Sequence, residues 1–163
     1  MRARSLVSRG IAVLVATVAV LLGLSGTGSA AAGTQMESAG VGLIRNIGSG
    51  NGCMDLQSYA SGTPVTLYRC NSSTESQRFD IKGDGTIHSF HTGFCMDISS
   101  YTAGAVVHMK PCHHGTSQQW NNWGDTIYSW GNPALCMDLS SYNNGTPVTL
   151  APCGSQNSQR WAW

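Results

Sequence analysis

Residues 136–153 read CMDLSSYNNGTPVTLAPC, and nearly the same sequence occurs twice earlier, beginning at Cys53 and at Cys95. Each copy opens with Cys-Met-Asp, continues through a Ser-Tyr pair and a Gly, and closes at a second Cys 17 residues after the first. The copies begin about 41 residues apart, and self-similarity at a fixed period indicates a repeat architecture. We therefore interpret the chain as three copies of one unit.

The ends of the units carry further signals. Each unit closes with Gln, one variable residue and an aromatic residue, in Gln77-Arg78-Phe79, Gln118-Gln119-Trp120 and Gln159-Arg160-Trp161. Short Gly-Asp sequences ending at Ile87 and Ile127 open the second and third units, and Ile44 opens the first. These signals place the units at about 42–83, 84–124 and 125–163, after a short leader at 33–41.

Within each unit the pattern is that of short strands. PVTLYRC, AVVHMKPC and PVTLAPC are rich in β-branched residues, and no sustained helical period follows the apolar start of the chain. A glycine stands at the same place in each loop, at Gly62, Gly104 and Gly145, as a tight turn with positive φ requires. The sequence predicts an all-β domain, in which three units share a core because one unit cannot bury its own apolar face. A propeller has more blades than this chain has units.

The closing triplets supply the expected core. We expect their aromatic residues to be buried, and their glutamines to satisfy buried backbone groups. The Met of each Cys-Met-Asp is interpreted as an inward, apolar filler. The structural residues predicted in this way are Gln77, Phe79, Gln118, Trp120, Gln159 and Trp161.

The start of the chain reads as an export signal. Arg2, Arg4 and Arg9 precede an uncharged apolar run at 11–24, and small residues follow it with a cleavage point after about Ala30 to Ala32. This order is typical of a secretory signal peptide, which we place at 1–32, with a signal anchor as the alternative. No second apolar run of membrane length follows, so we expect a secreted protein without a membrane span.

The cysteines fit an oxidising compartment. All six lie after the predicted signal peptide, and an even number in an exported chain predicts disulfides. Zinc is the alternative, but it needs ligands in close groups that this sequence lacks. Each bridge would contribute roughly 3 kcal/mol on the chain-entropy model. Since each unit holds its own pair, the predicted bridges are Cys53–Cys70, Cys95–Cys112 and Cys136–Cys153.

The charge balance excludes some partners. Beyond residue 32, six basic residues face eight acidic ones, so the domain lacks the basic face that nucleic acid requires. No nucleophile motif, phosphate loop or metal-ligand spacing is present, and we predict no metal, no cofactor and no catalysis. We expect a monomer.

Three units of roughly 40 residues, each with C-x-D, a paired Cys after V-x-L and a closing Q-x-W, resemble the ricin-type β-trefoil lectins. The same fold occurs in family 13 carbohydrate-binding modules. The resemblance covers about Val41 to Trp163. It implies a β-trefoil of twelve strands with pseudo-threefold symmetry and one shallow sugar pocket per unit.

The resemblance also implies site residues. The aspartates Asp55, Asp97 and Asp138 would accept hydrogen bonds from sugar hydroxyls; the alternative is that each caps a turn. The family's aromatic residue after V-x-L occurs once, at Tyr68, whereas units two and three have Lys110 and Ala151. Polar contacts after the second Cys are expected at Asn71 and His113, and unit three has Gly154 there. Unit one is therefore the best-equipped site and unit three the poorest.

A tyrosine follows each of these aspartates by four residues. Tyr59, Tyr101 and Tyr142 are predicted to cover the sugar in place of the missing rings, or alternatively to anchor their loops.

Together these features predict a secreted, non-catalytic lectin with up to three shallow sites, acting by avidity on galactose-type, mannose or xylan-like glycans. The alternatives are a protein-binding trefoil that resembles protease inhibitors, a glycan hydrolase, and a trefoil whose sugar sites have lapsed.

Overall fold

A computed structural model describes Met36 and residues 38–163 of the chain. The predicted signal peptide at 1–32, and residues 33–35 and 37 of the predicted leader, lie outside the described residues. Within the described part, no helix is long and apolar enough to cross a membrane.

The described residues form short strands joined by turns, as predicted. In chain order the strands are β1 (Gly40–Leu43), β2 (Arg45–Asn46), β3 (Gly52–Leu56), β4 (Val65–Arg69), β5 (Arg78–Ile81), β6 (Ile87–Ser89), β7 (Cys95–Ile98), β8 (Val107–Lys110), β9 (Trp120–Trp123), β10 (Thr126–Ser129), β11 (Asn132–Leu139), β12 (Val148–Pro152) and β13 (Trp161–Ala162). Three single-turn 3₁₀ helices, η1 (Glu75–Gln77), η2 (Thr116–Gln118) and η3 (Asn157–Gln159), precede the closing strands. Ile44 separates β1 from β2, so the described chain has one segment more than the twelve expected.

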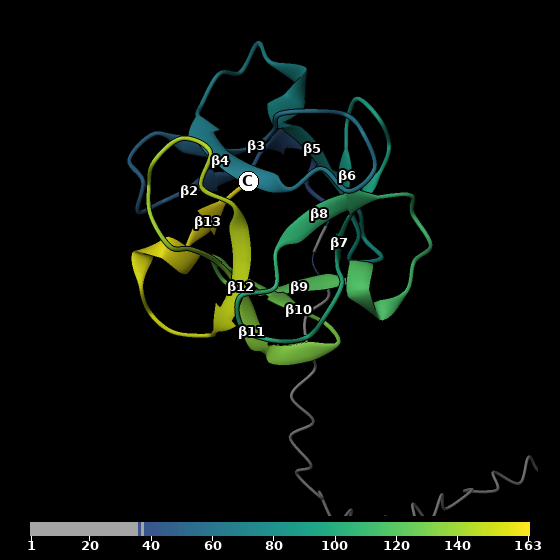
Figure 1. The fold of residues 1–163 in the computed structure, drawn as a ribbon, viewed down its shortest axis with the longest axis vertical. Helices are drawn as coiled ribbons and strands as arrows, with labels where there is room; N and C mark the ends of the chain where they lie inside the picture. Colours follow the sequence, from purple (N-terminus) through teal and green to yellow (C-terminus); the bar gives the residue numbers. More distant parts are fainter. Residues whose placement is uncertain (1–35, 37) are drawn as a thin grey trace, which may run out of the picture. The chain divides into compact units, whose positions relative to one another are not determined.

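The strands pair in three antiparallel sheets arranged about a common centre (Figure 1). Each sheet crosses a unit boundary: β5 pairs with β6, β9 with β10, and β13 with β2. The last strand, β13, thus pairs with β2, which belongs to the first unit. This topology, with three repeats and one disulfide in each, is the predicted β-trefoil.

The loop glycines connect neighbouring units. Gly62, Gly104 and Gly145 have φ of 89°, 86° and 86°, the left-handed conformation predicted for them. Each donates its backbone N–H to a strand of another unit, with N–O distances of 2.7 Å to Met109, Leu150 and Leu67 respectively. The same three strand residues donate back to the residue after each glycine. Two hydrogen bonds therefore join every pair of units around the centre.

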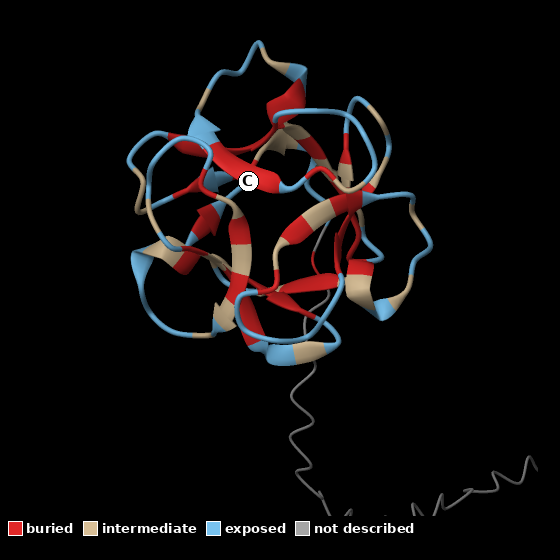
Figure 2. Ribbon diagram, in the orientation of Figure 1, coloured by how far each residue is buried: buried red, intermediate tan, exposed pale blue. Residues whose placement is uncertain are grey.

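The core lies where the three units meet (Figure 2). Phe79, Trp120 and Trp161 are each 1% exposed, which confirms their predicted burial. The indole N–H groups of Trp120 and Trp161 donate to the backbone carbonyls of Met96 and Met137 at 3.2 Å. Fully burying such a side chain contributes roughly 1.5–3 kcal/mol. The Met residues of the three Cys-Met-Asp sequences are fully buried, as expected for apolar filler.

All three predicted disulfides are present, and each closes a loop within its own unit. The described chain has no free cysteine. Each bridge joins the strand that carries Cys-Met-Asp to the end of the following strand, and so fixes the hairpin on which the predicted sugar-binding aspartate lies.

Candidate functional site

The glutamine of each closing triplet positions the segment around the second Cys. Gln77 donates from Nε2 to the Arg69 carbonyl at 2.9 Å and accepts the Asn71 N–H at 2.7 Å. Gln118 and Gln159 make the equivalent pairs of bonds. These glutamine side chains are almost fully buried, and they satisfy backbone groups of the neighbouring segment, as predicted.

In unit one, three predicted site residues come together. Asp55, Tyr68 and Asn71 line a cavity of about 400 Å³, together with Arg69, Cys70, Thr74 and Gln77. The Tyr68 ring is 40% exposed, whereas Asp55 is 5% exposed at the end of strand β3. Asp55, Tyr68 and Asn71 therefore line one cavity in this unit, and their contact with a sugar stays a prediction.

Two side chains hold the Asp55 carboxylate. Gln57 Nε2 donates to Oδ2 at 2.8 Å, and Ser76 Oγ donates to Oδ1 at 2.6 Å. A carboxylate has about four lone-pair positions, so acceptor capacity remains for a ligand hydroxyl. Sequence reasoning did not single out Gln57. Gln57 follows directly after strand β3 and bonds Asp55 from there.

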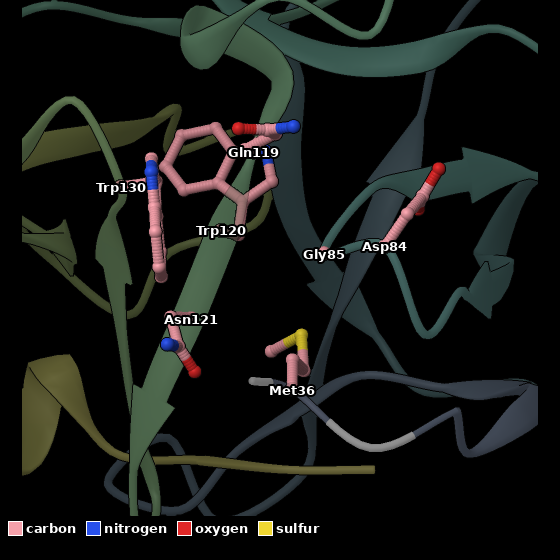
Figure 3. A pocket seen from close by; sticks show the side chains of 7 residues that line it. All are labelled: Met36, Asp84, Gly85, Gln119, Trp120, Asn121 and Trp130. Atoms are coloured by element: carbon pink, nitrogen blue, oxygen red, sulfur yellow. The ribbon is translucent and has the colours of Figure 1, made fainter. Parts of the chain in front are cut away.

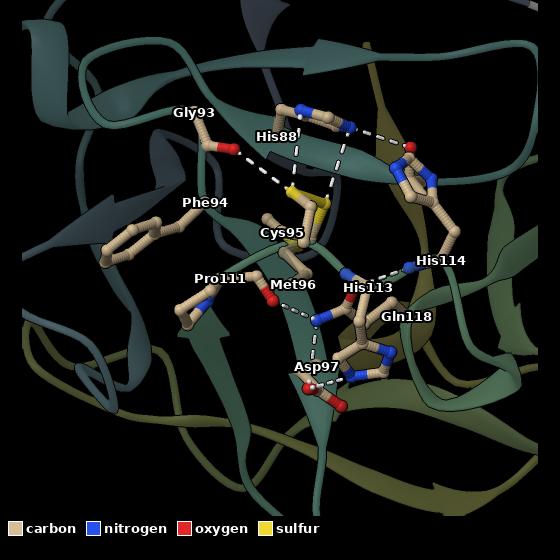
Figure 4. The surroundings of a disulfide bond; sticks show 12 residues. His88, Gly93, Phe94, Cys95, Met96, Asp97, Pro111, His113, His114 and Gln118 are labelled. Atoms are coloured by element: carbon tan, nitrogen blue, oxygen red, sulfur yellow. Dashed lines mark hydrogen bonds and ion pairs between the residues drawn. A yellow bond between two sulfur atoms is a disulfide. The ribbon is translucent and has the colours of Figure 1, made fainter.

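Unit two also brings predicted site residues together (Figure 4). Asp97 and His113, both predicted, line a cavity of about 440 Å³ with Lys110 and His108. Asp97 Oδ2 accepts from Gln118 Nε2 at 3.0 Å and lies 3.2 Å from His113 Nε2. His113 thus places an imidazole beside the carboxylate, and Asn71 stands at the equivalent sequence position in unit one.

In unit three the aspartate differs from the other two in its hydrogen bonding. Asp138 Oδ1 is buried and has no hydrogen-bond partner among the described residues. Ser158 and Gly154 stand where unit one has Ser76 and Asn71. The three equivalent aspartates therefore have three different surroundings. The predicted ranking of the sites stays a prediction.

The comparisons with known proteins agree with this geometry. The sequence profile of the ricin-type β-trefoil lectin domain matches residues 40–161. The chain belongs to this family. A search of curated proteins found no match.

Three solved structures are similar to this lectin domain. Their sequence identity to it is low, so the similarity shows the fold alone. A mosquitocidal holotoxin is 22% identical over 74% of this chain, with a TM-score of 0.67. The hemolytic lectin CEL-III is 22% identical over 79%, with a TM-score of 0.66. This chain spans only 16% and 31% of those two proteins. The earthworm R-type lectin C-half, in complex with GalNAc, is 15% identical over 76% of this chain and 96% of its own length, with a TM-score of 0.62.

The Ser-Tyr tyrosines of the lectin domain lie at the boundaries between units. Tyr59 stacks on His91, with ring centroids 4.0 Å apart. The Tyr101 ring lies so close to Gly131, and the Tyr142 hydroxyl so close to Gly48, that a Cβ on either glycine would overlap them. Each tyrosine thus packs on the turn before the Cys-Met-Asp strand of another unit. This packing matches the anchoring alternative. The rings remain 37–47% exposed, so sugar contact stays a prediction.

A histidine lies against the disulfide of unit two (Figure 4). His88 Nε2 is 3.4 Å from Cys95 Sγ and 2.8 Å from Thr86 Oγ1, and His88 Nδ1 is 3.8 Å from Cys112 Sγ. His88, Cys95 and Cys112 have the spacing of a metal site. Both sulfurs are bonded to each other, however, and a thiolate is what binds a metal. The cluster is therefore part of the disulfide's packing. Burial, followed by the positive charge of Lys82, lowers the pKa of His88.

Proposed function

We propose that the protein is an exported, non-catalytic lectin that binds glycans through the repeat sites of its trefoil. The cavity of unit one carries this proposal, because the Asp55 carboxylate and the Tyr68 ring line the same hollow. The ionised carboxylate accepts sugar hydroxyls, and the ring covers the apolar C–H face of a pyranose. Membership of a lectin family supports the same function.

The similarity to a lectin solved with GalNAc makes galactose-type sugars the first ligands to test, with mannose and xylan-like glycans next. Shallow cavities of about 400 Å³ bind single sugars weakly. Several such sites on one molecule retain it on a polysaccharide or cell surface by avidity. Export is part of the proposal, and the basic, apolar and small-residue order of residues 1–32 supports it.

A glycan array tests the function. The native protein is compared with a variant in which Asp55, Asp97 and Asp138 are all changed to Ala, and with Asp80→Ala as a control acid outside the cavities. We expect the native and control proteins to bind one coherent class of sugar and the triple variant to lose it, while its circular dichroism stays native. Equal binding by the triple variant, or no binding by the native protein, would overturn the proposal.

A further inference from the structure

The cavity of unit two differs from that of unit one in its basic side chains. One acid, Asp97, lines it together with His108, Lys110 and His113, and its volume is about 440 Å³. The cavity of unit one has a single basic residue, Arg69. Groups that carry or can gain a positive charge therefore gather around the aspartate of unit two.

The pairing of strands β7 and β8 brings these side chains to one face. Asp97 lies directly opposite His108, and Lys110, two residues further along β8, lies opposite Cys95. The residues between them on both strands are buried methionines. Because successive side chains of a strand point to opposite faces, the aspartate, the histidine and the lysine share the outer face. Cβ atoms directly opposite one another are roughly 4.5–5.5 Å apart, and diagonal neighbours are within reach of a long side chain.

The other two units have neutral residues at the same pairings. Thr66 and Tyr68 take these positions in unit one, and Thr149 and Ala151 take them in unit three. The backbone register is the same in all three units. The basic character of unit two therefore comes from its side chains alone, at positions that surround an otherwise equivalent aspartate.

The carboxylate of unit two is held on one side and open on the other. His113 Nδ1 accepts the N–H of Gly115 at 3.0 Å, so in the neutral ring Nε2 carries the proton, and it lies 3.2 Å from Asp97 Oδ2. Gln118 Nε2 donates to the same oxygen at 3.0 Å. Asp97 Oδ1 receives no hydrogen bond from a described residue and, unlike Asp138 Oδ1, is not fully buried. This oxygen can accept a ligand hydroxyl.

The two basic residues of β8 keep their donors for a ligand. Lys110 is exposed, and its ammonium forms no ion pair with a described residue. The His108 ring, which is half-buried, likewise has no hydrogen-bond partner in the part of the chain that the structure describes. An ammonium group has three donors, and an imidazole has at least one in its neutral and its protonated form. Where unit one presents the Tyr68 ring, unit two thus presents a charge.

We propose that the site of unit two binds an anionic sugar, one that carries a carboxylate or a sulfate group. A hydroxyl of this sugar donates to Asp97 Oδ1, and its anionic group lies at Lys110 and His108, at the far end of the diagonal from the carboxylate. Charge-assisted hydrogen bonds are shorter and stronger than those between neutral groups, so the anionic group selects the ligand. The inference rests on the proposed function and names the class of ligand for one repeat site.

The cavity beside Trp130 provides an internal control (Figure 3). Its volume is about 240 Å³, and none of the predicted sugar-binding residues lines it. Among the described residues around it, Asp84 is the one charged side chain. An anion gains nothing there, so the Trp130 indole signal reports on non-specific binding.

Titration of the ¹⁵N-labelled protein, followed by nuclear magnetic resonance, tests the choice of ligand. The probes are methyl glycosides: galactose against galacturonic acid and galactose 6-sulfate, and glucose against glucuronic acid. We expect the backbone amide signals of Asp97 and His113 to shift saturably, with roughly three- to tenfold higher affinity for an anionic sugar than for its neutral counterpart. The Trp130 indole signal should stay in place. Comparison of galacturonic acid with the 6-sulfate distinguishes the two anionic groups.

Two variants and a change of salt assign the preference to the lysine. Lys110→Gln keeps a polar side chain and should abolish the preference for the anionic sugar. Lys82→Gln removes another exposed lysine, which pairs with Asp80 outside the cavity, and should leave the preference unchanged. Raising NaCl from about 50 mM to about 500 mM should weaken the binding of the anionic sugar and not that of the neutral one, because salt screens an exposed charge.

The outcomes separate this inference from the proposed function. Equal affinity of unit two for neutral and anionic sugars, or an unchanged preference in Lys110→Gln, would overturn the inference and leave the proposed function standing. Equal shifts with sodium acetate would also overturn it, because the site would then bind an adventitious ion only. No shifts in any unit, with any of these sugars, would contradict both proposals.

Discussion

At the scale of single residues, the repeated aspartate shows how neighbours decide what an identical residue can do. Asp55 is held by Gln57 and Ser76, whereas Asp97 is held by Gln118 and His113. Asp138 has a buried oxygen without a partner among the described residues. A carboxylate that is already oriented loses less conformational entropy when a sugar binds. Unit one, which also has Tyr68, is therefore where the tightest repeat site is expected.

Tyr68 tests that expectation. Tyr68→Ala removes the ring beside Asp55 and should weaken sugar binding in unit one by roughly five- to tenfold, about 1 kcal/mol. Tyr68→Phe keeps the ring and should bind nearly as the native protein does. Titration with the best monosaccharide from the array, monitored at unit-one resonances, measures both. Native affinity in Tyr68→Ala would show that this ring does not contact the sugar.

Gly145 tests a backbone requirement. Its φ is 86°, and no atom lies within 4 Å of the position that a Cβ would take, so Gly145→Ala introduces strain but no clash. Placing a side chain in the left-handed region costs about 1–2 kcal/mol, which urea unfolding can measure. Gly42→Ala is the matched control, because it has equal space and no positive φ. Equal stability of the two variants would contradict this explanation.

His88 predicts an acid-sensitive contribution to stability. Its pKa is below its ordinary value of 6.5 in the folded protein, chiefly through burial and then Lys82, although Asp84 and Asp80 act in the opposite direction. As the pH falls through 6.5, the unfolded chain binds a proton before the folded protein does, so folding stability decreases. Between about pH 8 and pH 5, His88→Gln should therefore lose less stability than the native protein in thermal unfolding. An unchanged pH dependence in His88→Gln would contradict the assignment.

At the scale of elements, each unit contains a hairpin that is closed by a disulfide, and a buried glutamine bonds the segment at the end of that hairpin. The three bridges close loops of equal length, with a sequence separation of 17. The entropy that a bridge removes from the unfolded chain depends on that length. The three bridges should therefore stabilise the fold by similar amounts.

Removing one disulfide at a time tests whether the three bridges stabilise the fold equally. Changing Cys136 and Cys153 together to Ala should lower the free energy of unfolding by about 3 kcal/mol, and the two other paired changes should do the same within about 1 kcal/mol. Urea unfolding of the three double variants provides the measurement. A bridge whose loss leaves stability unchanged would show that loop closure is not its main contribution.

Sequence reasoning succeeded for the elements because their requirements are local. The positive φ of Gly62 and the burial of Met54 follow from the chemistry of a few consecutive residues and from their repetition. The stack of Tyr59 on His91 was not predicted, since these residues lie in different units and their contact depends on how the units meet. The cavity beside Trp130 was missed for the same reason, because Met36 and Asp84 reach it from distant parts of the chain.

At the scale of the whole molecule, the repeat places Asp55, Asp97 and Asp138, the centres of the proposed sites, at equivalent positions around one core. The hydrogen bonds between loop glycines and neighbouring strands hold the units together, so the sites keep fixed spacings. Fixed spacing favours simultaneous contact with a dense array of glycans and does little for a sugar that is free in solution.

The difference between binding to a glycan-coated surface and binding to a free sugar can be measured. A variant with Asp97→Ala and Asp138→Ala should keep the native affinity of unit one for a methyl glycoside. On a glycan-coated surface it should dissociate faster, with apparent affinity reduced by about 100-fold or more. Surface plasmon resonance and solution titration compare the two formats. A loss of the same size in both would contradict a role for avidity.

The pairing of β13 with β2 gives the units a cyclic order. The last strand of the third unit is bonded to the first unit as β5 is bonded to β6 and β9 to β10, so no boundary between units differs in kind from the others. A circular permutant, with Trp163 linked to Gly40 and the chain reopened in the turn at Gly124, would keep every one of these pairings. The linear order of the units is then a property of the gene and has little bearing on the folded state.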